Sequence, residues 1–206
     1  VFTMLSLVSG IALLYISLKD APLSTFWYFL GLGIAGIIAA ITYTAGKKPY
    51  GYMGLGDISV LIFFGWVGVI GSYYLYSLQW DISLLLPATS CGLFAVGVLN
   101  VNNIRDIESD RVTGKNSIPV RLGREKAVVY HWCLLLLGML ATVVYTLLAP
   151  GATWTSWLFL LAFPLFIKNG WAVTNIKDAK LLDPYLKQMA LSTLVFVVLF
   201  GLGQIL

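Results

Sequence analysis

The chain has 206 residues, of which 59% are hydrophobic and only 11% charged, and its formal net charge is +4. A soluble domain of this length cannot bury so much apolar surface in one core, so the composition excludes an ordinary water-soluble enzyme and indicates an integral membrane protein. Backbone polar groups must be paired inside lipid, so we expect an all-α, polytopic bundle of transmembrane helices. The positive charge suits anionic lipid headgroups and gives no reason to invoke nucleic acid.

Seven apolar segments are predicted to cross the membrane, since about 20 helical residues span a hydrocarbon core. The sixth contains Pro164, Lys168 and Asn169, which predicts a kinked or broken helix. Because no linker divides the chain, residues 1–206 are expected to form one domain. Val1 is an improbable natural start, so further residues are expected before it. The seven segments are Phe2 to Leu18, Leu23 to Ala45, Ile58 to Leu78, Ile82 to Val101, Ala127 to Ala149, Trp157 to Ile176 and Gln188 to Leu206.

The cations gather on one side of the predicted membrane. The connections after the second, fourth and sixth segments, residues 46–57, 102–126 and 168–187, hold twelve of the thirteen Lys and Arg residues. By the positive-inside rule, these three connections face the cytoplasm. One miscounted segment would scatter the cations over both sides, so their regular placement supports the count of seven.

The connection 102–126 is the most polar part of the chain, with six of the thirteen cations and four of the nine acids. If it continues the fourth segment as a helix, Asn102, Asp106 and Asp110 follow one another at i, i+4 and i+8, and Asn103 approaches the same face. Two carboxylates one turn apart repel each other modestly, but a divalent cation bound between them makes the arrangement favourable. Mg²⁺ is commonly held by one or two carboxylates together with phosphate oxygens, so this pattern predicts a magnesium site.

Cations in the same connection extend this hypothesis. Five of them could neutralise diphosphate oxygens, to which Arg can donate two parallel hydrogen bonds. They are Arg105, Arg111, Lys115, Arg121 and Arg124. The alternative is a solvated loop with weak ion pairs, which is the commoner meaning of mixed charge. The length of the connection and the helical register of its acids raise the metal and phosphate hypothesis to a level with this alternative, and both stay open on the pattern alone.

The connection 46–57 combines Lys47, Tyr50 and Tyr52 with four glycines. Glycines allow close approach of the backbone, and a lysine beside two tyrosines could bind an anionic aromatic substrate. The alternative is a flexible turn with a headgroup-binding lysine and interfacial tyrosines. His131 stands alone near a segment end, and we expect it to be a polar packing residue rather than a base.

The run from Asn102 to Arg111, followed by Gly114-Lys115 and by Val120 to Gly123, resembles the second aspartate-rich motif of the UbiA-type intramembrane aromatic prenyltransferases. With residues 38–44, 49–52 and 54–58, the similarity covers essentially the whole chain, and it is strongest to the members that act on dihydroxynaphthoate. That family is all-helical, with nine transmembrane helices around a central chamber. The seven segments here correspond to its helices three to nine.

The resemblance implies Mg²⁺-dependent transfer of a polyprenyl group from polyprenyl diphosphate to dihydroxynaphthoate, with loss of the ring carboxylate, in the bacterial cytoplasmic membrane. The active-site connections would face the cytoplasm. It also implies roles for residues of this chain: metal ligation by Asp106 and Asp110 with support from Asn102 and Asn103, diphosphate contacts from Arg105, Lys115 and Arg121, and acceptor contacts from Lys47, Tyr50 and Tyr52.

The chain departs from the family pattern, because the first motif, N-D-x-x-D, is absent. The chain alone is therefore expected to be inactive, as a portion of a longer enzyme. A family member with a hydroxybenzoate or haem acceptor stays open. From other classes, a secondary transporter would place ionisable residues near the middle of spans, whereas the acids here lie at span ends and in connections. A CDP-alcohol phosphotransferase would need a D-G-x-x-A-R segment, which does not precede Asp106.

Overall fold

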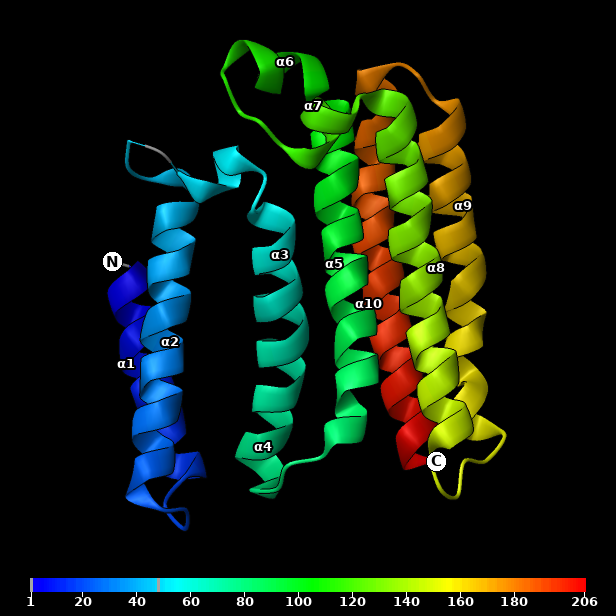
Figure 1. Ribbon diagram of the computed structural model, residues 1–206. Coiled ribbons are helices and arrows are strands. Elements are labelled where there is room, and N and C mark those ends of the chain that lie inside the picture. Colours follow the sequence, from blue (N-terminus) through cyan, green and yellow to red (C-terminus); the bar gives the residue numbers. More distant parts are fainter. Residues whose placement is uncertain (1, 48) are drawn as a thin grey trace.

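The computed structural model describes residues 2–47 and 49–206 and shows a bundle of long helices, with no strand among the described residues (Figure 1). The predicted all-α architecture is therefore confirmed. The expectation about the start of the chain concerns Val1, which lies outside the described residues, as does Lys48 in the connection 46–57.

The helices follow the predicted order. Among the described residues, six continuous helical stretches are long and apolar enough to cross a membrane. The first predicted segment forms a helix of 16 residues, which is shorter than the usual span of about 20. The elements are α1 (Phe2–Ser17), α2 (Leu23–Thr44), η1 (Tyr50–Met53), α3 (Gly56–Val60), η2 (Leu61–Gly71), α4 (Ser72–Ser77), η3 (Ile82–Leu84), α5 (Leu85–Arg105), α6 (Ile107–Val112), α7 (Ile118–Leu122), α8 (Arg124–Leu148), η4 (Thr155–Ala162), α9 (Phe163–Asn175), η5 (Ala179–Leu182) and α10 (Asp183–Ile205).

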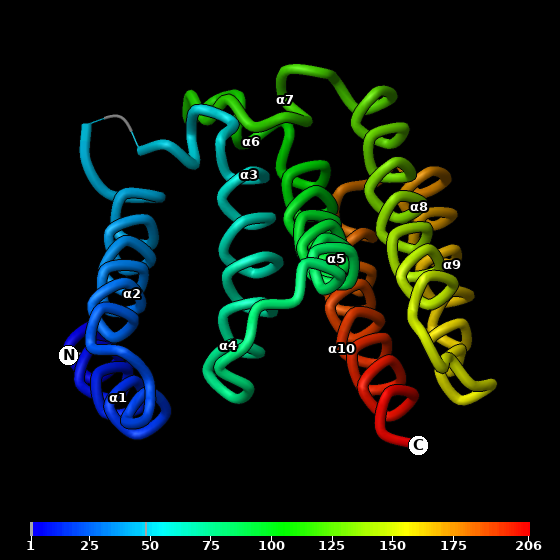
Figure 2. Tube along the Cα trace, turned by 60° about the horizontal axis from the view of Figure 1, so that its bottom comes forward, coloured from blue at the N-terminus to red at the C-terminus, as the bar shows by residue number. Residues whose placement is uncertain are grey.

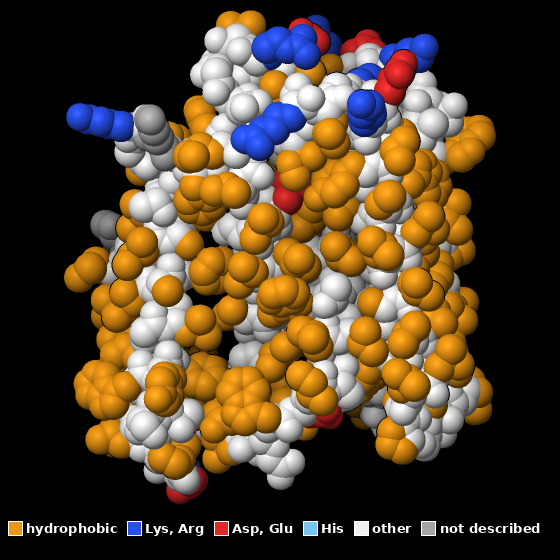
Figure 3. Space-filling view, in the orientation of Figure 1, with side chains coloured by type: hydrophobic (Ala, Val, Ile, Leu, Met, Phe, Trp, Pro, Cys, Tyr) orange, Lys and Arg blue, Asp and Glu red, His pale blue; other side chains and the backbone are white. Residues whose placement is uncertain are grey.

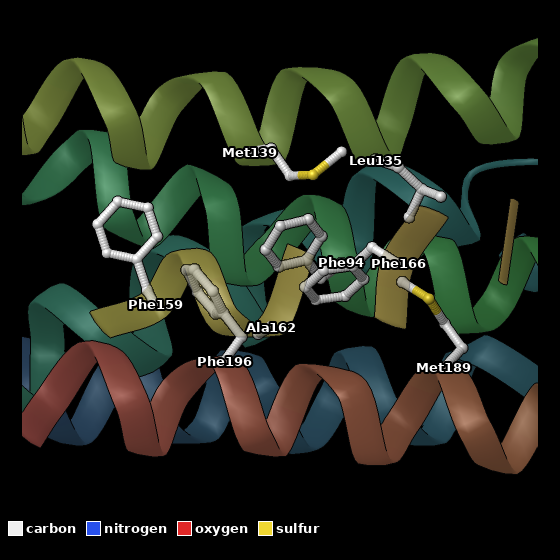
Figure 4. Packing of buried hydrophobic residues seen from close by; sticks show 8 residues of the cluster. All are labelled: Phe94, Leu135, Met139, Phe159, Ala162, Phe166, Met189 and Phe196. Carbon is white, nitrogen blue, oxygen red and sulfur yellow. The ribbon is translucent and has the colours of Figure 1, made fainter. Parts of the chain in front are cut away.

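The apolar core lies between α5, α8, α10 and the helical stretch formed by η4 and α9. Phe94 of α5 stacks on Phe166 of α9 with ring centroids 4.0 Å apart, and Phe196 of α10 meets Phe94 edge-on at 4.9 Å. Figure 4 shows these rings directed toward one another from their separate helices. Such offset and edge-to-face pairs join α5, α9 and α10 through both area burial and ring electrostatics, and Leu135 and Met139 of α8 pack in the same cluster.

The hairpin of α1 and α2 stands apart from this core. None of the residues of α2, all of which the structure describes, is buried. A groove of about 330 Å³ separates the hairpin from η2 and α4, and its mostly apolar lining includes Leu14, Phe29, Gly36 and Phe63. Figure 2 shows α1 and α2 side by side at one edge of the bundle, and Figure 3 shows gaps beside α2.

Two helical stretches depart from regular α geometry. The stretch from α3 to α4 contains a π-helix of 11 residues, η2, which the sequence analysis did not predict. The predicted irregularity of the sixth segment is confirmed, because the 3₁₀-helix η4 changes to the α-helix α9 at Phe163. Pro164, which has no N–H to donate, lies in the first turn of α9, directly after the change of helix type.

The charged connections share one end of the bundle, where Figure 1 shows α6, α7 and the start of α8 beside the end of α9. The predicted connection 168–187 was too long, since α9 continues to Asn175 and α10 begins at Asp183. Lys168 therefore lies on a helix, where it is exposed. Its aliphatic stem can lie along apolar surface while the ammonium reaches toward the interface, so one lysine does not end the helix.

Candidate functional site

The polar end of the bundle begins where α5 ends. α5 continues past the predicted segment to Arg105, and Asp106, with φ −95° and ψ 9°, interrupts the helix before α6. Two i to i+4 hydrogen bonds cross the interruption, from the N–H of Asp106 to the carbonyl of Asn102 (3.0 Å) and from the N–H of Asp110 to the carbonyl of Asp106 (2.8 Å). The expectation of one continuous helix is therefore wrong at Asp106. The break lets Ile107 turn into the interior, where only 7% of it is exposed.

The first group of predicted residues surrounds the guanidinium of Arg105. Its Nε and Nη2 atoms donate to the two carboxylate oxygens of Asp106 at 2.7 and 2.8 Å, and Nη2 also donates to Asn102 Oδ1 at 2.9 Å. Its Nη1 atom donates to Asp183 Oδ1, 2.5 Å away in the first turn of α10. Arg105 therefore occupies both oxygens of Asp106 and ties the end of α5 to the start of α10.

The second group surrounds the ammonium of Lys115 and is more buried. Lys115 Nζ lies 2.8 Å from Asp110 Oδ2 and donates to Asn103 Oδ1 at 3.0 Å. The hydroxyl of Ser117 donates to the same Asp110 oxygen at 3.5 Å. Asp110 and Asn103 are only 8% and 3% exposed. The other carboxylate oxygen of Asp110, Oδ1, accepts no hydrogen bond from the described residues and is therefore open to a further partner.

The connection 46–57 lies directly against the connection 102–126. The N–H of Asn116 donates to the carbonyl of Tyr52 at 2.8 Å, and Arg121 donates to the carbonyl oxygens of Asn116 (3.1 Å) and Met53. Gly54, with φ 73°, makes this approach possible, because a Cβ there would lie 3.0 Å from the guanidinium carbon of Arg121. The structure thus brings together the two connections that the sequence singled out.

The three predicted acceptor residues have different surroundings. The hydroxyl of Tyr50 lies 2.9 Å from the hydroxyl of Ser59, and its ring meets that of Tyr43 edge-on at 5.4 Å. Tyr52 is 40% exposed, and Lys47 is also exposed. Tyr50 is therefore fixed in place, whereas Tyr52 and Lys47 are accessible at the surface of the same connection.

Two neighbouring residues were missed as a site by the sequence analysis. Asp57, in the first turn of α3, is only 5% exposed, and its Oδ2 atom accepts a hydrogen bond from the hydroxyl of Tyr130 on α8 at 2.9 Å. The available signal was an acid at the start of a long apolar helix, which is costly in a membrane protein and often functional. By contrast, His131 is buried, as a packing role requires, and its Nε2 atom lies 3.0 Å from the amide oxygen of Asn169.

The two aspartates fit part of a magnesium shell. In the described part of the chain, no three His, Cys, Asp or Glu side chains come together to hold a metal ion. Mg²⁺ often takes one or two carboxylates and completes its shell with water and phosphate oxygens. Asp110 offers its open Oδ1 atom, whereas Asp106 would have to exchange Arg105 for the metal. The site therefore provides a minority of the ligands, with cations suited to phosphate beside them.

Fold and site together define a multi-pass helical membrane protein with carboxylates and cations concentrated at one end of the bundle. Its family follows from comparison with known proteins: residues 1–202 match the model of the UbiA prenyltransferase family, and the chain belongs to this family.

Three relatives illustrate the similarity. The chain is 47% identical over 203 residues to the 1,4-dihydroxy-2-naphthoate octaprenyltransferase of Haemophilus influenzae, covering 98% of this chain and 65% of the relative. Identity to the protein of the same name from Escherichia coli K12 is 47% over 196 residues, 95% of this chain and 63% of the relative. The Mycobacterium tuberculosis protein of that name is 34% identical over 194 residues, 94% of this chain and 63% of its own length. The chain thus spans slightly less than two thirds of the length of these relatives.

Proposed function

We propose that the chain contributes the second aspartate site and the acceptor side of a prenyltransferase that transfers a polyprenyl group from polyprenyl diphosphate to 1,4-dihydroxy-2-naphthoate, with loss of the ring carboxylate. The observation that carries this proposal is the buried group of Asp110, Lys115 and Asn103 beside the connection 46–57. The names of relatives that are 47% identical support the choice of donor and acceptor.

In this proposal the carboxylates of the site bind the metal and the cations bind the phosphate. Asp110 and Asp106 would hold Mg²⁺, which supplies positive charge to the departing diphosphate when it is bound. Lys115 and Arg105, each paired with one of these carboxylates, would contact the phosphate oxygens. Positive charge placed in advance where negative charge develops is an effective way to lower the barrier of such a step.

The shape of the membrane part supports an isoprenoid substrate. The groove between the α1–α2 hairpin and η2 is lined by apolar side chains such as Leu14, Ile37 and Val67. A polyprenyl chain offers only apolar surface, so it gains free energy by burial in such a groove or in lipid beside it. We place the protein in the bacterial cytoplasmic membrane with the charged end toward the cytoplasm, as the positive-inside rule indicates.

Substitution of the two carboxylates tests the proposal. In the full-length protein, Asp110→Asn and Asp106→Asn should each lower prenyl transfer by roughly 100-fold or more, because each removes a charge that would hold the metal at the diphosphate. Glu108→Gln is the matched control, since this acid lies on α6 between them with its side chain 86% exposed, and should leave the rate unchanged. Wild-type rates in both aspartate variants would refute the metal assignment.

The choice of acceptor is tested separately. Purified full-length protein supplied with polyprenyl diphosphate and Mg²⁺ should prenylate dihydroxynaphthoate in preference to hydroxybenzoate or haem, with product identified by mass spectrometry. Preferential prenylation of either competitor would keep the reaction class and overturn the acceptor.

A further inference from the structure

The role proposed above leaves the carboxylate of Asp57 unexplained. Asp57 is 5% exposed, and its hydrogen-bond partner is a neutral phenol, that of Tyr130, at 2.9 Å. Within the described part of the chain, no Lys, Arg or His forms an ion pair with it. A buried carboxylate without a counter-charge destabilises the fold, so its presence calls for a functional explanation.

One oxygen of this carboxylate remains available to a ligand. Tyr130 donates to Oδ2, whereas no side chain of the described residues donates to Oδ1. The fully enclosed polar side-chain atoms without a partner in that part of the chain are Asn100 Oδ1 and His131 Nδ1. Asp57 Oδ1 is not among them, so it is not fully enclosed by the surrounding atoms.

Aromatic side chains and bare backbone lie beside the residue that precedes Asp57. A Cβ placed on Gly56, the residue before Asp57, would lie 3.0 Å from the hydroxyl of Tyr43 and 3.4 Å from the side chain of Leu99. The ring of Tyr43 in turn meets that of Tyr50 edge-on. An acid set among phenol rings and an apolar side chain suits a flat aromatic ligand that carries a hydrogen-bond donor.

The cationic part of the site is close along the chain. Gly54 lies against the guanidinium of Arg121. Asp57 follows Gly54 by three residues, so the Cα atoms of Gly54 and Asp57 are at most about 10 Å apart. Figure 3 shows the Lys and Arg side chains gathered at this end of the molecule. A fused bicyclic ring with an anionic group at one end and a hydroxyl at the other matches this order of charges.

We propose that Asp57, oriented by Tyr130, accepts a hydrogen bond from the hydroxyl of the aromatic acceptor and so sets its orientation. This proposal rests on the function proposed above. In dihydroxynaphthoate the hydroxyl next to the carboxylate forms an intramolecular hydrogen bond with it. The hydroxyl on the opposite side of the ring is free to donate a hydrogen bond to the protein. The carbon that receives the prenyl group carries the carboxylate and must face the diphosphate, so the free hydroxyl points away from the cations and toward Asp57.

Binding of two probes tests this role without requiring catalysis. The affinities of 4-hydroxy-2-naphthoate and of 2-naphthoate, which lacks the hydroxyl, are measured by quenching of tryptophan fluorescence in lipid nanodiscs. The wild-type chain should bind the hydroxylated probe about tenfold more tightly, as one hydrogen bond to a charged group suggests. Asp57→Ala should bind both probes equally, and Tyr130→Phe should reduce the preference. Tyr145→Phe, the same substitution near the other end of α8, should preserve it.

The ratio of the two affinities is the readout, because a general loss of folded protein weakens both probes alike. If Asp57→Ala does not fold, Asp57→Asn keeps the shape and should lower the ratio at least threefold. An unchanged ratio in the folded Asp57 variants would overturn the proposal, even in a protein that transfers prenyl groups normally. A ratio that depends on Asp57 in a protein with no prenyl transfer would uphold the acceptor site and overturn the proposed function.

Discussion

At the scale of single residues, close contact between two glycines determines how α5 packs on η2. A Cβ on Gly65 would lie 2.7 Å from the carbonyl oxygen of Ala88 and 2.8 Å from the Cα of Gly92. Small residues of this kind let membrane helices approach each other through their backbones. Gly65→Ala should therefore lower the free energy of unfolding by about 1–3 kcal/mol, measured by thermal unfolding in detergent.

Gly33→Ala provides the control for this substitution. A Cβ on Gly33, in α2, would meet nothing within 4 Å, and alanine is favoured over glycine in helices by roughly 0.5–1 kcal/mol. Gly33→Ala should therefore leave the unfolding temperature unchanged or raise it. Equal stability of the two variants would show that the α5–η2 contact is loose enough to accept a methyl group.

The individual residues of the site were only partly predictable from the sequence. The i, i+4 spacing identified Asp106 and Asp110, and both lie at the charged end as predicted. The pattern could not show that each carboxylate has its own cation, because that division depends on the helix break at Asp106. Asp57 was missed because its partner Tyr130 lies 73 residues away, and no local spacing joins them.

At the scale of elements, Arg105 links the end of α5 to the first turn of α10. Replacing Arg105 with Gln removes the ion pairs to Asp106 and Asp183 and should loosen the short segment that leads into α10. Loss of about 1 kcal/mol corresponds to roughly fivefold more opening. Trypsin should then cut after the exposed Lys177 and Lys180 about fivefold faster than in the wild-type protein.

Arg111→Gln is the matched control, because this arginine makes an exposed ion pair with Glu108 at 3.4 Å and contributes little. Its cleavage rate should equal that of the wild-type protein. If Arg105→Gln is also cut at the wild-type rate, the link does not restrain the start of α10.

The boundaries of elements were predicted less well than their existence. Apolar length alone predicted a helix in each of the seven segments, six of which are long enough to cross a membrane, because lipid requires a span to satisfy its own backbone. It could not show that α5 continues to Arg105 or that α10 begins at Asp183, since polar residues can extend a helix beyond the hydrocarbon core. It also could not show the π-helix η2, whose apolar residues are equally compatible with α geometry.

At the scale of the whole molecule, the bundle has one charged end and one nearly uncharged end, and the membrane topology follows from which end faces the cytoplasm. Lys19 lies in the turn at the end opposite to Lys47 and Lys177, and all three are exposed. Each is replaced by Cys in a protein whose Cys91 and Cys133 are changed to Ala. In intact spheroplasts a membrane-impermeant maleimide should label position 19, and positions 47 and 177 should react only after permeabilisation.

The same method decides whether α1 crosses the membrane. Its 16 residues are fewer than a span usually needs, and Figure 1 shows α1 starting short of the charged end that α2 approaches. A spanning α1 places Thr3 on the same side as Lys47, because α1 and α2 then run in opposite directions through the bilayer. Thr3→Cys should therefore react like position 47, only after permeabilisation. Labelling of Thr3→Cys together with position 19 in intact spheroplasts would leave α1 on one surface and reduce the number of spans in this chain to six.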